Sequence, residues 1–71
     1  MGIEQRKMIG RSVRALRRER GLTQGQLAAM IGNSSKQYIF AIENGDKNVT
    51  IDVLCRIAEA LDVPVRDLID F

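Results

Sequence analysis

The segment covering residues 22 to 45 constrains the fold most, because Gly32 divides it into two short stretches of helical character. Thr23 precedes Gln26 by three residues, which is the capping-box pattern found where a helix begins. In that pattern each of the two side chains bonds a backbone N–H group near the helix start. A first helix is therefore predicted between Thr23 and Gly32.

A second helix is predicted to begin after Ser35, whose hydroxyl can accept a hydrogen bond from a backbone N–H group at the helix start. Ile39 and Ile42 follow at helical spacing and predict the buried side of this helix. Two short helices joined at a glycine have the layout of a helix-turn-helix, whose second helix can enter a groove of DNA.

The rest of the chain predicts an all-α fold in one small domain, 1–71. Apolar residues recur at helical spacing, and no stretch shows the sustained alternation of a strand. The five expected helices cover residues 4–20, 24–31, 36–44, 51–61 and 65–70. The expected core consists of Ile9, Val13, Leu16, Leu27, Ile31, Ile39, Ile42, Leu54, Ile57, Ala58, Leu61 and Leu68.

The order and spacing of residues over nearly the whole chain resemble the Cro/cI-type, or XRE-type, helix-turn-helix domain. No single position is specific, and the combined pattern carries the resemblance. It rests on Ile9, Gly10, Val13 to Arg17, Gly21 to Gln24, Leu27, Ala28, Ile39, Ile42 to Gly45, Leu54, Ile57, Ala58, Ala60, Leu61 and Val63 to Ile69. The resemblance implies a compact five-helix λ-repressor-like DNA-binding domain, with the helix-turn-helix formed by the second and third helices.

One departure from the family pattern lies in the turn. Ile39 follows Gly32 by seven residues, one more than the family usually has. We place the extra residue before the helix, because Ser35 then keeps the family's distance from the helix cap to the isoleucine. The alternative places it inside the helix and moves the cap to Ser34.

The resemblance assigns four residues of the third helix to the base edges of the major groove. Gln37 can form two hydrogen bonds with adenine, and Lys36 can donate to guanine. Phe40 and Ala41 offer apolar surface of the kind that a thymine methyl group contacts. Lys36 and Gln37 could instead be the ordinary polar residues of an exposed helix, but an exposed Phe40 between them is hard to explain on a free surface.

Phosphate contacts are implied for Gln24 at the start of the second helix and for Asn44, Lys47 and Asn48 after the third. A helix start presents free N–H groups, which agrees with the assignment of Gln24. Asn44 and Asn48 have an alternative explanation, because asparagine tolerates the backbone angles of loops. Tyr38 lies either against phosphate or half-buried beside the second helix.

The family also pairs an arginine of the first helix with the glutamate that follows the two isoleucines. Arg17 and Glu43 occupy those positions here. The resemblance implies a structural ion pair, and if it is buried, loss of either partner would leave the other charge stranded.

Charge is distributed unevenly along the chain, although the net charge is only +2. Residues 1–20 hold seven basic and two acidic side chains, whereas residues 50–71 hold two basic and five acidic ones. Lys7, Arg11, Arg14 and Arg18 form one stripe of the first helix at 100° per residue. The stripe is a solvated outer face, a source of long-range attraction to phosphates, or both.

These observations predict a sequence-specific DNA-binding transcriptional regulator that binds double-stranded DNA as a homodimer, on an inverted-repeat operator. One recognition helix covers only a few base pairs, so dimerisation would double the contacts. The apolar residues Val65, Leu68, Ile69 and Phe71 are candidates for the dimer interface, and the alternative for them is closure of a small core. The alternative function is a protein-binding adaptor or antitoxin-like module with the same fold.

Other classes of protein are disfavoured by composition. The chain has no His and a single Cys, Cys55, so no set of ligands for a zinc site and no catalytic constellation can be assembled, and no enzyme, metal or cofactor is expected. One free cysteine and the lack of a signal peptide or a long apolar run predict a cytoplasmic protein that does not meet the membrane. The length leaves no room for a separate ligand-sensing domain, so no small-molecule ligand is expected.

Overall fold

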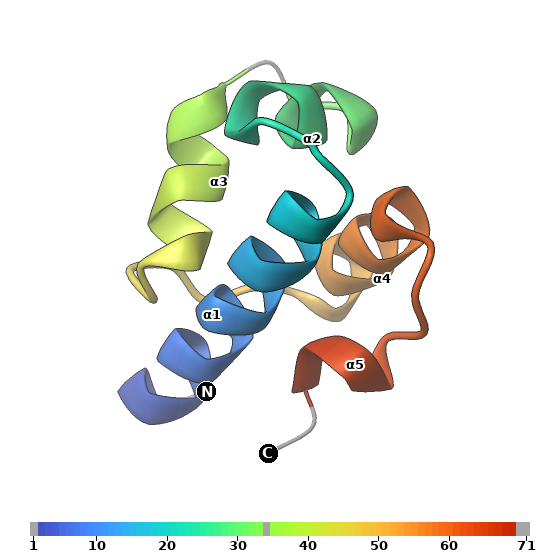
Figure 1. Cartoon of the computed structure of the whole chain (residues 1–71). Coiled ribbons are helices and arrows are strands. Elements are labelled where there is room, and N and C mark those ends of the chain that lie inside the picture. The colour runs from blue at the N-terminus through green and yellow to red at the C-terminus, as the bar shows by residue number, and fades with distance from the viewer. Residues whose placement is uncertain (1, 34, 70–71) are drawn as a thin grey trace.

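The computed structural model describes residues 2–33 and 35–69, which form five α-helices and no strand. The helices are α1 (Ile3–Glu19), α2 (Gln24–Met30), α3 (Lys36–Glu43), α4 (Ile51–Leu61) and α5 (Arg66–Ile69) (Figure 1). The all-α prediction is confirmed, and each helix lies within one residue of its expected bounds. In the described part of the chain, no helix is both long and apolar enough to cross a membrane.

The start of α2 has the predicted capping box. The N–H group of Gln26 donates to Oγ1 of Thr23 at 3.0 Å, and the N–H group of Thr23 donates to Oε1 of Gln26 at 2.8 Å. The chain turns sharply just before this box, at Gly21, where φ is +69°. A left-handed backbone of this kind favours glycine, so Gly21 allows α1 to end and α2 to start in a new direction.

The start of α3 is in the predicted place but is capped differently. The helix begins at Lys36, so the extra residue of the turn precedes it, as predicted. The expected cap by the Ser35 hydroxyl is wrong: that hydroxyl donates to Oε1 of Gln37 at 2.9 Å, and it caps no N–H group. The physical reason is that the N–H group of Tyr38, which such a cap would bond, already donates to the carbonyl of Ser35 at 3.2 Å. Ser34, the alternative cap, lies outside the described residues.

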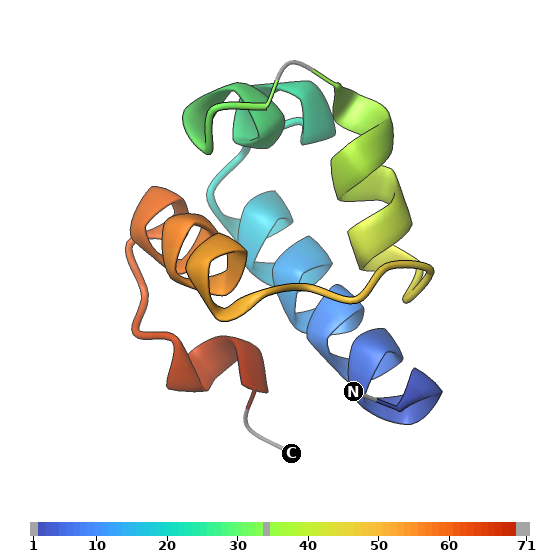
Figure 2. The same ribbon diagram turned by 180° about the vertical axis from the view of Figure 1, so that it is seen from behind.

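The core lies between α1 and the other helices. In Figure 1, α3 lies on one side of α1, and α4 and α5 lie on the other. Eleven of the twelve expected core residues are buried, and Leu16 is only partly buried. Val49 is a buried residue that the prediction missed. It belongs to the segment that links α3 to α4 and crosses α1 (Figure 2). This segment is not helical, so helical periodicity could not have indicated which of its residues are buried.

Gly10 allows α1 and α3 to pack closely. A Cβ atom built on Gly10 would lie 2.5 Å from the carbonyl oxygen of Ile42 and would also overlap the carbonyl of Glu43. Only a residue without a side chain fits against the backbone of α3 at this point. Gly10 therefore sets how α3 is held on the body of the domain.

Candidate nucleic-acid interface

The outer side of α3 carries the four residues predicted to meet base edges. Lys36, Gln37 and Phe40 are exposed, Phe40 to 54%, and Ala41 is partly exposed. They lie together because positions one, four and five residues apart along a helix share a broad face. The opposite side of α3 is fixed to the core by fully buried isoleucines, so the helix presents one face outward.

Gln37 is oriented by its neighbour in the turn. Its Oε1 accepts the hydrogen bond from the Ser35 hydroxyl, and the backbone N–H of Ser35 donates to Oδ1 of Asn33 at 2.9 Å. The amide nitrogen of Gln37 remains available as a donor. Ser35 therefore orients the outward-facing side chain of Gln37. Nothing in the sequence pattern indicated this role.

The ion pair expected between α1 and α3 is present and buried. Arg17 binds Glu43 through two hydrogen bonds, Nε to Oε2 at 2.6 Å and Nη2 to Oε1 at 3.1 Å. Nη1 of Arg17 also donates to the carbonyl of Leu22 at 2.8 Å. The hydrogen bond to Glu43 raises the pKa of Arg17 above its ordinary value, and it outweighs the opposing effect of burial. The pair therefore stays charged and connected, as a bidentate arginine–carboxylate contact does.

Gln24 joins this cluster from the first position of α2. Its Nε2 donates to Oε1 of Glu43 at 3.1 Å, and the residue is partly buried. The glutamate of α3 is thus bonded to side chains of both α1 and α2. The sequence predicted Gln24 as a phosphate ligand, and its bond to Glu43 was not foreseen.

Lys47 and Tyr38 meet on one flank of α3. The Nζ atom of Lys47 lies 5.5 Å from the centroid of the Tyr38 ring, which is within the range of a cation–π contact. Tyr38 is partly buried and packs against the core, which agrees with the half-buried one of the two placements considered for it. The two residues border a hollow of about 320 Å³ that Asn33, Ser35 and Gln37 also line.

The loop after α3 is held by a residue that the sequence analysis did not single out. Asn44, Lys47 and Asn48 are all exposed on this loop. Arg6 of α1 donates through Nε to the carbonyl of Gly45 at 3.0 Å and through Nη1 to Oδ1 of Asn48 at 3.4 Å. A contact between residues so far apart in sequence leaves no local pattern that could have revealed it.

The apolar C-terminal residues predicted to form a dimer interface differ in their exposure. Leu68 is fully buried, so its assignment to a dimer interface is wrong, because its side chain closes the core against α1. Val65 is partly buried and also packs against the core. Ile69 is 39% exposed, and Phe71 lies outside the described residues.

Comparison with known proteins identifies the family. A model of the helix-turn-helix family HTH_3 matches residues 13–68, which include the capping box, the turn and the buried ion pair. The chain belongs to this helix-turn-helix family. It is a DNA-binding transcriptional regulator of the XRE type.

Relatives of this helix-turn-helix protein match most of its length. The HTH-type transcriptional regulator y4dJ of Sinorhizobium fredii is 39% identical over 94% of this chain and 86% of its own. Control protein C.BamHI of Bacillus amyloliquefaciens is 33% identical over 93% of this chain and 82% of its own. The crystal structure of the restriction-modification controller protein C.AhdI of Aeromonas hydrophila superposes with a TM-score of 0.86 at 32% identity, covering 92% of this chain and 97% of that one.

Proposed function

We propose that this regulator binds as a homodimer to an inverted-repeat operator and reads the major groove with the helix from Lys36 to Asn44. The observation that carries the proposal is the two-sided character of α3. Its inner side is fixed by buried isoleucines and by the Glu43 cluster, and its outer side exposes Lys36, Gln37 and Phe40. A recognition helix needs this combination, because bases are discriminated only by side chains held in a fixed register.

Phosphate contacts at the edges of the groove would set that register. We assign them to Gln24, Tyr38, Asn44, Lys47 and Asn48. The exposed loop that follows α3 supports the last three, and the bond from Arg6 holds its backbone. Tyr38 would contact phosphate through its hydroxyl, since its ring packs against the core.

The names of two relatives support a role as a controller. C.BamHI is named a control protein, and C.AhdI is named a restriction-modification controller. We propose a comparable role in transcriptional control for this chain. A dimer is expected because one recognition helix covers too few base pairs to select a site, and a two-fold protein favours a two-fold operator.

Selection from a pool of random duplex DNA tests the proposal. The protein is incubated with the pool, bound duplexes are recovered and sequenced, and the mass of the complex is measured by analytical ultracentrifugation. We expect an enriched inverted repeat bound by two copies of the chain. Enrichment of a single, unrepeated site bound by one copy would contradict the dimer. No enrichment at all would contradict sequence-specific binding and favour the adaptor or antitoxin-like alternative.

A further inference from the structure

A hollow of about 410 Å³ lies on the flank of α3 opposite the contact between Tyr38 and Lys47. Arg14 and Arg18 of α1 line one side of it, and Phe40 of α3 and Asn44, which follows α3, line the other. Phe40 and Asn44 are exposed members of the proposed interface. The hollow is therefore continuous with the surface that would meet DNA.

The lining of this hollow carries excess positive charge. It contains three arginines and one glutamate, which leaves two net positive charges. Arg17 and Glu43 bind each other, so the excess belongs to Arg14 and Arg18. Both of these side chains are exposed, and neither makes an ion pair or hydrogen bond within the described part of the chain. They are available for an anionic ligand.

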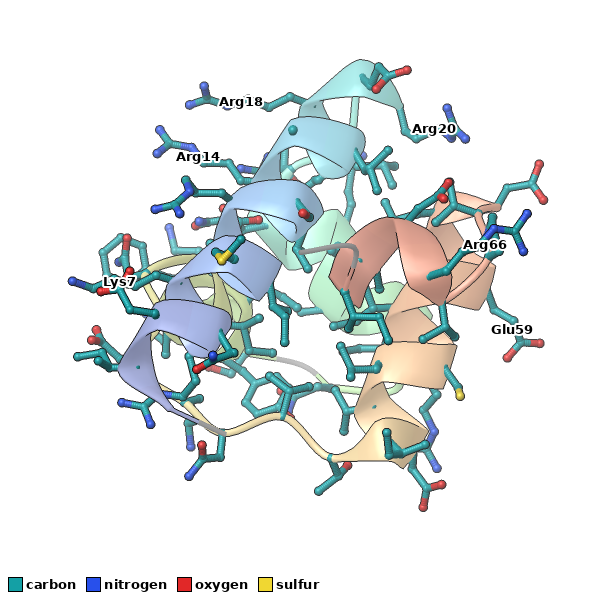
Figure 3. The ribbon with its side chains drawn as sticks, turned by 90° about the horizontal axis from the view of Figure 1, so that it is seen from below. Lys7, Arg14, Arg18, Arg20, Glu59 and Arg66 are labelled. Atoms are coloured by element: carbon teal, nitrogen blue, oxygen red, sulfur yellow. The ribbon has the colours of Figure 1, made fainter. Side chains whose placement is uncertain are left out.

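The direction of these arginines fits a DNA strand. Figure 3 shows Lys7, Arg14 and Arg18 projecting from one side of α1, whereas Arg66 projects from the opposite side of the molecule. The major groove is about 12 Å wide and is bordered by two sugar-phosphate strands. A helix in the groove therefore has one phosphate strand on each flank. Lys47 lies on one flank of α3, and Arg14 and Arg18 lie on the other.

We propose that Arg14 and Arg18 form a phosphate-binding site for the DNA strand on the α1 side of the recognition helix. The ligand is a phosphodiester of the same duplex whose bases meet α3, so the inference rests on the proposed function. Guanidinium groups suit this ligand, because they bind phosphate oxygens through paired N–H donors. The site extends the interface beyond the two helices of the motif to the basic stripe of α1.

The salt dependence of binding to a duplex tests this site, with a charge-matched control. The double variant Arg14→Gln and Arg18→Gln is compared with the double variant Arg56→Gln and Arg66→Gln, which removes two exposed arginines away from the hollow. Each contacted phosphate contributes about 0.9 to the slope of the logarithm of the binding constant against that of salt concentration. We expect the first variant to lose about 0.9 to 1.8 of the slope for each bound copy of the chain, and therefore about 1.8 to 3.6 for a dimer on a full operator. At 0.1 M salt this is a loss of about 8-fold to 60-fold in affinity for each bound copy. The control should keep the wild-type slope.

Neutral linkages in the DNA locate the contact. Single methylphosphonates, which lack the phosphate charge, are placed along both strands of the duplex. In each half-site, we expect a methylphosphonate at one or two positions to weaken binding by the wild-type protein and by the control. At those same positions it should not weaken binding by the Arg14→Gln and Arg18→Gln variant any further. Thermal unfolding followed by circular dichroism should give the same midpoint for all three proteins, since the substituted side chains are exposed.

The outcomes separate this inference from the function on which it rests. Equal slopes for the two double variants, with the same methylphosphonate pattern, would overturn the phosphate site and leave the DNA-binding proposal standing. If the wild-type protein bound neither the operator duplex nor a duplex of mixed sequence, both proposals would fail together.

Discussion

Glu43 shows how a single side chain can connect the parts of this domain. It belongs to α3, and it accepts hydrogen bonds from Arg17 of α1 and from Gln24 of α2. A buried carboxylate is costly unless its oxygens are bonded, and here both are. The resemblance to the family predicted the pair with Arg17. The bond from Gln24 depends on side-chain placement in three dimensions, so the sequence could not indicate it.

The coupling between Arg17 and Glu43 can be measured by a double-mutant cycle. Arg17→Ala and Glu43→Ala should each lower the free energy of unfolding by about 3–5 kcal/mol, because each leaves an uncompensated buried charge. The double variant should lose much less than the sum, since no charge is then stranded. Urea unfolding followed by circular dichroism gives the three values. Additive losses would mean that the two side chains do not stabilise each other.

Gln37 and Ser35 should affect sequence choice and leave stability nearly unchanged. Gln37→Ala should relax the preference at one base pair of each half-site by about 1–3 kcal/mol. Because Ser35 caps no N–H group and its hydroxyl orients Gln37, Ser35→Ala should change the free energy of unfolding by no more than about 0.5 kcal/mol and weaken the same preference. Binding to operators altered at single base pairs, with thermal unfolding in parallel, checks both. A loss of about 1 kcal/mol of stability in Ser35→Ala would show that it acts as a cap after all.

At the scale of the helices, the sequence predicted the features that depend on short, local patterns of residues. The capping box at Thr23 and the spacing of Ile39 and Ile42 are local patterns, and the elements they predicted are present within one residue. Contacts between elements were missed where they depend on chain segments without periodicity. Val49 in the α3–α4 segment and the bond from Arg6 to that segment are examples. For the candidate site, the base-facing residues followed from the resemblance to the family, whereas the hollow beside Phe40 required the placement of α1 against α3.

The packing of α1 on α3 predicts opposite effects for two glycine substitutions. Alanine favours a helix over glycine by about 1 kcal/mol, so both Gly10→Ala and Gly25→Ala gain helix propensity. At Gly10 the new methyl group would collide with the backbone of α3, and we expect a net loss of about 1–3 kcal/mol in the free energy of unfolding. At Gly25 the nearest atoms would be 3.9 Å away, and we expect a gain of about 0.5–1 kcal/mol.

Chemical unfolding of the two glycine variants measures the difference directly. If Gly10→Ala were as stable as the wild type, α1 and α3 would not pack as closely as the structure has them. A loss of stability in Gly25→Ala would indicate that α2 does not continue as a helix through that position.

At the scale of the whole molecule, positive and negative charges are concentrated at opposite ends of the sequence. The N-terminal segment, residues 1–20, carries five excess positive charges, and the C-terminal segment, residues 50–71, carries three excess negative ones. The basic stripe of α1 lies beside α3, and α5 lies on the other side of α1 (Figure 1). A second copy that docked through α5 would therefore leave α3 and the basic stripe of both copies open to DNA.

The dimer interface that the sequence predicts at the C-terminal residues can be tested at Ile69 of α5, the most exposed of those candidates that the structure describes. It is 39% exposed, and a lysine there should place a charge inside the interface and weaken dimerisation by at least about tenfold, since an unpaired buried charge is costly. Ile51→Lys is the matched control, because Ile51 is 69% exposed at the start of α4. Sedimentation equilibrium gives the dimer dissociation constant, and operator binding should require correspondingly more of the Ile69→Lys protein, since a dimer fills both half-sites together. If Ile51→Lys abolished the dimer and Ile69→Lys did not, the two copies would meet through the start of α4, and the assignment of the interface to α5 would be wrong.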